Sequence, residues 1–403
     1  MTSSSVSPGP WKKSLYTLLL AELLVMVGFS FVFPFMPLYI EKLGHFTTQQ
    51  AAFWAGIAEG ASGLGMFVFS PLWGIMADRS GRKPMVLRAM FGAAIVVGLI
   101  GISPNVPFLI SMRFIQGALT GTIAAASALI ASITPRDKMP LAMGLLMTMV
   151  YTGNSAGPLL GGLAADKFGN EATFFITSGI LVIGGLIVLL LVQEKYERPV
   201  FTSGNSWQRI FTLIRSKQML ALLVIQFTLQ AGPNMVAPII SLLMQQLNPS
   251  GAAATSTGIA MALSSVIAAV TATVVGRLAG RIPLKTILVY SCLGTCLVYL
   301  PPLTVGTVTQ LTVYIALRGL VNGGIMTSSY AIISLSIPPD QQGTAFGVVQ
   351  SANSLGNGLG PIVGGFLGST LGLKNVFAFT SGMYLLAGLL VIKALPRRPA
   401  EKA

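Results

Sequence analysis

The sequence predicts an all-α membrane protein in which twelve transmembrane helices form two six-helix bundles related by a pseudo-twofold axis. Three observations predict this fold class. The 403 residues are 53% hydrophobic and only 9% charged, and the mean hydropathy of +0.77 is typical of an integral membrane protein. Apolar runs of about 20 residues, long enough to cross a bilayer core of about 30 Å, recur along the chain. The second half of the chain repeats the pattern of the first.

Each apolar run is predicted to be a helix, because the runs lack the period-two alternation of barrel strands and are about twice as long. The first run is too long, and fits the pattern of the others too well, to be a cleaved signal peptide. To within several residues, the predicted spans are 15–38, 52–76, 84–103, 108–133, 140–165, 172–193, 218–246, 254–279, 284–303, 309–336, 342–368 and 374–395.

The longest polar interruption divides six predicted helices from six. It reads "EKYERPVFTSGNSWQRIFTLIRSK" and carries charges of both signs together with Pro, Gly and Ser. We therefore expect an N-terminal bundle over 1–193, a cytoplasmic linker over 194–217 and a C-terminal bundle over 218–403. Within the linker, "WQRIFTLIR" is either a short amphipathic helix at the headgroup surface or a plain connection.

The net charge of +14 is explained mainly by topology. If the N-terminus is placed inside, most Lys and Arg residues fall in cytoplasmic turns and few in outer turns. The positive-inside rule then places both termini in the cytoplasm. A nucleic-acid partner is not expected, because no soluble segment is long enough to form a domain around a basic patch. The expected surroundings are a lipid bilayer.

The two halves of the chain resemble each other in sequence. "GNSAGPLLGG" at 153–162 recurs as "GNGLGPIVGG" at 356–365, and "TSG" at 177–179 recurs with the same offset at 380–382. Near the start of each half, "GFSFVFPFMPL" matches "GPNMVAPIISL", which places Pro34 opposite Pro238. Such a duplication predicts two bundles with a cavity between them that opens to alternate sides by rocking.

Four segments resemble the signatures of the major facilitator superfamily. They are "GIMADRSGRK" between the second and third helices, "RFIQG" from Arg113 in the fourth, "GNSAGPLLGG" in the fifth and "GFSFVFPFMP" in the first. The last three together resemble the drug:proton antiporter branch with twelve helices, and in particular bacterial multidrug exporters. The resemblance covers the whole chain. It implies a monomer in the bacterial cytoplasmic membrane that exchanges protons for small amphipathic drugs.

The segment "GIMADRSGRK" concentrates four charged residues in ten positions. We expect it to gate the cytoplasmic side, with Asp78 accepting hydrogen bonds from arginines or from the amides of a helix N-terminus across the bundle interface. A simple topology anchor remains the alternative. The matching turn of the second half, "GRLAGRIPLK", has Gly280 in place of Asp78. The gating residues are Gly74, Asp78, Arg79, Gly81, Arg82 and Lys83.

The glycine-rich segment of the fifth helix has small residues at spacings of three and four, which let another helix approach its backbone closely. Pro158 removes an amide donor and predicts a kink or hinge. The resemblance associates this segment with antiport. Its residues are Gly153, Gly157, Pro158, Gly161 and Gly162.

Two carboxylates, Glu22 and Glu59, fall inside predicted spans of the first half, and none does in the second half. An ionisable group at membrane depth is costly unless it faces a wet cavity or a partner. We therefore assign both residues to proton coupling or substrate binding, with Arg113 as the exchangeable ion-pair partner of Glu59. The alternatives are a Glu22 hydrated near the inner interface and a static pair of Glu59 with Arg113.

The second half offers mainly neutral polar groups for a substrate cavity. Arg318 is the exception, because it occupies helix ten where Arg113 occupies helix four and has no carboxylate in its own half. It could bond backbone carbonyls, reach Glu22 or bind an anionic substrate. The cavity candidates are Gln226, Gln230, Asn234, Arg318, Asn322 and Tyr330.

An enzyme is not expected, because the chain has one histidine, no phosphate-binding loop and no spacing of ligands for a metal or cofactor. Cys292 and Cys296 lie in one apolar run and suit ordinary packing. The first functional hypothesis is a proton-coupled exporter of lipophilic, often cationic compounds. The alternative is an exporter or facilitator of a specific anionic metabolite or lipid, with Arg318 as the ligand.

Overall fold

The protein is described by a computed structural model that covers residues 10–135, 138–194, 217–249, 251–278, 281–336 and 342–394. These residues form helices, and no strand occurs among them. The α-helices are α1 (Pro10–Val32), α2 (Met36–Gly44), α3 (Thr48–Ser80), α4 (Lys83–Gly101), α5 (Val106–Leu119), α6 (Thr122–Ile133), α7 (Met139–Phe168), α8 (Asn170–Leu191), α10 (Lys217–Leu247), α11 (Ala253–Leu278), α12 (Leu284–Val298), α13 (Val308–Ser336), α14 (Gln342–Leu371) and α15 (Asn375–Ala394). Short 3-10 helices are η1 (Phe33–Phe35) and η3 (Pro301–Thr304).

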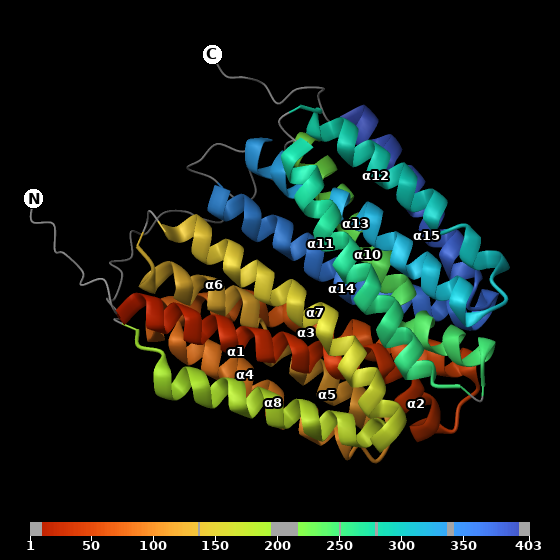
Figure 1. The fold of residues 1–403 in the computed structure, drawn as a ribbon, viewed down its shortest axis with the longest axis horizontal. Coiled ribbons are helices and arrows are strands. Elements are labelled where there is room, and N and C mark those ends of the chain that lie inside the picture. Colours follow the sequence, from red (N-terminus) through yellow and green to blue (C-terminus); the bar gives the residue numbers. More distant parts are fainter. Residues whose placement is uncertain are drawn as a thin grey trace, which may run out of the picture.

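Each predicted span falls mainly on helix in these ranges, and the all-α prediction is confirmed. By length and composition alone, eight of the described helical stretches are long and apolar enough to cross a membrane. Figure 1 shows the helices of the first half mostly on one side of the molecule and those of the second half mostly on the other. We call the end where α1 begins and α15 ends the termini end. The opposite end, where α2, α7 and α14 end, is called the far end.

The first predicted span is longer than expected and changes its helix type midway. α1 passes through η1 into α2, so that helical structure continues to Gly44. The change falls at Pro34, which has no amide hydrogen to donate to an α-helical ladder. This irregular segment contributes Phe33, Pro34 and Pro37 to the central cavity described below.

The fourth predicted span is interrupted, which the sequence analysis did not foresee. α5 ends in an extended Thr120, and Gly121 has a φ of 109° before α6 begins. The carbonyls freed at this break have side-chain partners. The indole Nε1 of Trp73 donates to the oxygen of Ala118 at 2.5 Å. The guanidinium of Arg88 donates to the oxygen of Thr120 at 3.4 Å and lies 3.7 Å from the centre of the Trp73 ring.

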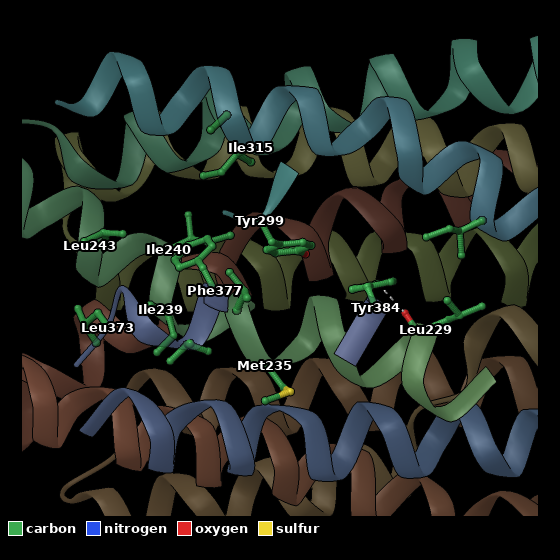
Figure 2. Packing of buried hydrophobic residues seen from close by; sticks show 14 of the residues in the cluster. Leu229, Met235, Ile239, Ile240, Leu243, Tyr299, Ile315, Leu373, Phe377 and Tyr384 are labelled. Atoms are coloured by element: carbon green, nitrogen blue, oxygen red, sulfur yellow. Dashed lines mark hydrogen bonds between the residues drawn. The ribbon is translucent and has the colours of Figure 1, made fainter. Parts of the chain in front are cut away.

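Buried apolar side chains form two clusters, one drawn mainly from the first half and the other mainly from the second. Figure 2 shows part of the second cluster, in which Tyr384 donates its hydroxyl to the carbonyl of Leu229 at 3.2 Å. Tyr299 stacks on Tyr384 with 5.9 Å between ring centres. The division into domains at 193 and 218 stays a prediction, and almost all of the expected linker lies outside the described residues.

Candidate functional site

A cavity of about 420 Å³ lies between helices of the two halves. Prolines, aromatic rings and a methionine supply half of its lining residues, and six polar or charged side chains converge on it, the mixture that ligand pockets generally show. Its lining residues are Phe29, Ser30, Phe33, Pro34, Pro37, Glu59, Asn154, Pro158, Asn234, Ala237, Pro238, Met261, Ser265 and Arg318.

Glu59 of α3 and Arg113 of α5 form an ion pair at this cavity. The Arg113 side chain is 4% exposed and that of Glu59 is 22% exposed, so Glu59 is the more exposed side chain of the pair. Arg113 also donates to the side-chain oxygen of Gln116 at 2.7 Å, and its guanidinium lies 4.4 Å from the centre of the Phe33 ring. The second oxygen of Glu59 is buried and has no hydrogen-bond partner in the described structure. A proton bound there would satisfy an unpartnered buried oxygen.

Glu22 of α1 is fully buried and is not among the residues that line the cavity. Neither of its carboxylate oxygens has a hydrogen-bond partner among the described groups. The side chain of Thr122, the first residue of α6, interacts with this carboxyl outside hydrogen-bond geometry. Glu22 thus lies beside the break between α5 and α6, away from the path of a substrate in this conformation.

Arg318 of α13 lines the cavity from the second half. It forms no ion pair with a carboxylate of the described residues, so the contact with Glu22 that the sequence left open is not made. On its other side Arg318 lines a much smaller pocket with Tyr299, Tyr314 and Phe377. The Arg318 guanidinium therefore lies between the main cavity and an aromatic cluster, and it has no carboxylate partner among the described residues.

The polar groups of the cavity are arranged in the same way in both halves. Ser30 donates to the side-chain oxygen of Asn154 at 2.6 Å. In the second half, Asn234 of the cavity donates to the side-chain oxygen of Asn357 at 2.9 Å, and Gln230 donates to the same oxygen at 2.7 Å. Gln230 and Asn357 themselves are not among the residues that line the cavity. Each asparagine acceptor comes from a copy of the repeated glycine-rich segment, which therefore holds one neutral cavity residue in each half, Ser30 and Asn234.

The other predicted cavity residues lie away from the cavity or outside the described side chains. Gln226 is buried and Asn322 is partly buried, and neither is among the residues that line the cavity. The side chain of Tyr330 lies outside the described part of the structure. Several lining residues were not predicted from sequence, including Asn154, Met261 and Ser265. Asn154 carried a usable signal, because it is identical in the two copies of the repeat.

The glycine-rich segment of α7 contacts two helices at once. A Cβ at Gly153, Gly157 or Gly161 would meet the backbone or Cβ atoms of α1. On another face, a Cβ at Gly162 would meet the backbone of Ala254 and Thr255 in α11. The segment is therefore close-packed both within its own half and against the other half, as expected for small residues in membrane helices.

The predicted gating segment is mostly helical. α3 continues to Ser80, so the turn consists of Gly81, with a φ of 94°, and Arg82. The Glu194 carboxylate accepts hydrogen bonds from the amides of Arg82 at 2.9 Å and Lys83 at 2.8 Å. Its negative charge offsets the positive end of the α4 helix dipole. The Lys83 ammonium donates to the oxygens of Leu189 and Val192 at the end of α8.

The gating role of this segment stays a prediction. The positions of Gly74, Asp78 and Arg79 beyond their backbone lie outside the described part, and so do the hydrogen bonds expected of the Asp78 carboxylate. Among the residues that the structure describes, no group of three or more His, Cys, Asp or Glu residues is placed to hold a metal ion.

The fold and the cavity define a class of protein: a polytopic α-helical membrane transporter with a binding cavity between two sets of helices. The family model of the Major Facilitator Superfamily matches residues 18–240 and 222–403. The chain belongs to the Major Facilitator Superfamily. It is therefore a transporter rather than an enzyme.

Curated relatives match along the full chain. Multidrug resistance protein MdtG of Klebsiella pneumoniae (strain 342) is 32% identical over 404 residues, covering 100% of this chain and 98% of the relative. The protein of the same name from Citrobacter koseri is 33% identical over 400 residues, covering 98% of each chain.

Solved structures agree in fold at low sequence identity. A bacterial homologue of the human lysosomal transporter Spinster, in an inward-facing and occupied conformation, matches with a TM-score of 0.80 at 15% identity, covering 96% of this chain and 97% of that one. The nucleoside transporter NupG matches with a TM-score of 0.77 at 14% identity, covering 94% and 98%. These likenesses establish the shared fold.

Proposed function

We propose that the protein is a proton-coupled multidrug exporter that moves lipophilic, often cationic compounds across the bacterial cytoplasmic membrane by alternating access. The observation that carries this proposal is the cavity between the halves, which places an acidic residue, Glu59, beside an apolar and aromatic wall. The names of the full-length relatives support the multidrug class. Methionine and aromatic side chains adapt to ligands of varied shape.

The proposed mechanism uses the exchange of one ion pair. In the unprotonated state Glu59 is held by Arg113. A proton that binds the carboxylate neutralises it and releases the guanidinium, which changes what the cavity can bind. A cationic substrate competes with the proton for the same carboxylate, so that uptake of one accompanies release of the other. Glu22 is proposed as a second proton site, in a dry environment beside the break between α5 and α6.

The orientation follows from the basic residues. We propose that both termini are cytoplasmic, which makes the termini end the inner side and the far end the outer side. Lys83 and Lys285 lie at the termini end, where each donates to a carbonyl near the end of the last helix of its half. We further propose that the protein works as a monomer, because a complete cavity is formed within one chain.

A second candidate is favoured by Arg318. This guanidinium lines the cavity without a carboxylate partner among the described residues, whereas the charge of Glu59 is already offset by Arg113. The described lining therefore carries an excess of positive charge, which suits a substrate with an acidic group. Export of an anionic metabolite, lipid or acidic drug is the corresponding function.

Two substitutions discriminate the candidates in purified protein reconstituted into liposomes. Glu22→Gln should abolish export of a lipophilic cation under the first candidate and matter little under the second. Arg318→Gln should lower transport of an amphipathic carboxylate at least about tenfold under the second candidate, the loss of one charge-assisted bond, and spare the cation. Arg281→Gln removes the same charge from an exposed turn at the termini end and serves as the matched control. If Glu22→Gln and Arg318→Gln both transport the cation and the carboxylate as the parent does, both candidate functions are contradicted.

A further inference from the structure

The far end of the molecule is closed by two equivalent junctions between the halves. In one, a Cβ at Gly258 of α11 would meet the carbonyl of Pro158 in α7. In the other, a Cβ at Gly56 of α3 would meet the carbonyl of Pro361 in α14. Pro158 and Pro361 occupy the same place in the repeated glycine-rich segment. Close apolar packing is thus common to both junctions.

A polar bond distinguishes the two junctions. Near the end of α7, Asp166 accepts a hydrogen bond from the backbone amide of Thr255 at 2.8 Å. Thr255 is the third residue of α11, so its amide has no acceptor within its own helix. A carboxylate at a helix N-terminus is stabilised by the helix dipole as well as by the bond itself. The counterpart of Asp166 in α14 is Ser369, whose hydroxyl donates to Phe366 of its own helix.

Asp166 is not held by a charge of its own half. It forms no ion pair among the described residues, and the neighbouring Lys167 directs its ammonium over the Phe168 ring instead. The one hydrogen bond shown for its carboxylate crosses to the other half. Asp166 is also exposed, so water can replace this bond when the halves separate.

We propose that Asp166 is a gating residue that latches the far end closed by capping α11 across the interface between the halves. The bond between Asp166 and Thr255 must break before the cavity opens on that side. Its loss therefore shifts the resting equilibrium toward the conformation that is open at the far end. This inference rests on the proposed alternating access, but it requires neither proton coupling nor any particular substrate.

The test measures access to the cavity from the far side. In a variant with Cys292 and Cys296 replaced by serine, Ser265→Cys places a reporter thiol on the cavity wall. A membrane-impermeant maleimide is applied to intact spheroplasts, with no substrate and no imposed pH gradient. We expect Asp166→Ala, which removes the acceptor oxygen, to raise the labelling rate several-fold, and Asp166→Asn, which keeps an acceptor oxygen without the charge, to restore it in part. Glu171→Gln, which removes another carboxylate near the same end, should leave the rate unchanged.

The acceptor side is tested separately through Thr255. Thr255→Pro removes the amide donor in the first turn of α11, where no hydrogen bond within the helix is lost, and should raise labelling as Asp166→Ala does. Thr255→Ala keeps the amide and should behave like the parent. The double variant that combines Asp166→Ala with Thr255→Pro should label no faster than either single variant. An unchanged rate in Asp166→Ala would overturn the proposal. Effects of the two substitutions that multiply in the double variant would also overturn it. If these variants change the labelling rate as expected but the protein shows no proton-coupled transport, the proposed function is refuted and the role of Asp166 is not.

Discussion

Arg113 and Glu59 are the residues whose pairing was best anticipated from sequence. Carboxylates are rare within the predicted spans, and depth along each helix, at about 1.5 Å per residue, placed these two side chains at similar levels. The structure contains the pair. The contact of Arg113 with Gln116 is one between side chains three residues apart in α5, which helical spacing allows. The contact with the Phe33 ring could not be predicted, because it depends on helix rotation and on the irregular segment η1.

Removing one partner of this pair should affect stability and transport differently. Glu59→Gln leaves the buried Arg113 without its carboxylate and should lower the free energy of unfolding by about 3–5 kcal/mol. The double variant Glu59→Gln with Arg113→Met should recover much of this loss, because no unpaired charge remains. Thermal unfolding in detergent measures the stability of each variant.

Transport by the same variants provides the contrast. The double variant should remain inactive in proton-coupled transport although its stability recovers. Transport requires the pair if its two residues exchange partners during the cycle, whereas it does not require a pair that is only structural. Active transport by the stabilised double variant would contradict the exchange role. Arg113→Lys keeps the charge but loses the planar donor fork, and should also be inactive.

Arg318 and Glu22 show the limit of single-residue reasoning. Sequence placed both within spans, yet a cavity is defined by the rotation of several helices, which composition does not encode. Arg318 lines the cavity and Glu22 does not. The substrate charge is therefore best argued from the residues that the cavity brings together.

At the scale of the helix, the break between α5 and α6 was not predictable from hydropathy. The run from 108 to 133 is predominantly apolar on both sides of Gly121, and glycine is frequent in membrane helices. The interruption depends on tertiary partners, because Trp73 and Arg88 accommodate the freed carbonyls. By contrast, the glycine-rich segment of α7 was predictable, since its spacing of small residues indicates close approach by another helix. Sequence alone does not say which helices approach.

The break provides a clean test of backbone conformation. Gly121 has a φ of 109°, and a Cβ added there would meet no other heavy atom within 4 Å. Gly121→Ala should therefore be destabilising purely through backbone strain, by about 1–2 kcal/mol. Gly179 has the same open space but lies inside α8, so that Gly179→Ala should leave stability unchanged or raise it slightly. Equal thermal midpoints for the two variants would contradict the strained role of Gly121.

At the scale of the molecule, the fold was largely predictable and its conformational state was not. Apolar runs of membrane-spanning length and an internal repeat are strong signals, and together with the family signatures they led to the superfamily fold. Which end of the cavity is closed depends on a small difference in free energy between alternative arrangements of the same helices. The close contacts of Gly162 and Gly258, and the bond from Thr255 to Asp166, reveal a closed far end.

Proton coupling through Glu59 is the central claim of this account, and proton flux in proteoliposomes tests it most directly. Purified protein is reconstituted with a pH-sensitive dye inside, a pH gradient is imposed, and a lipophilic cation, a zwitterion and an anion are added in turn. We predict that at least one substrate class drives proton movement in the parent protein and that Glu59→Gln abolishes it. Absence of flux with every substrate, or full flux in Glu59→Gln, would contradict the claim.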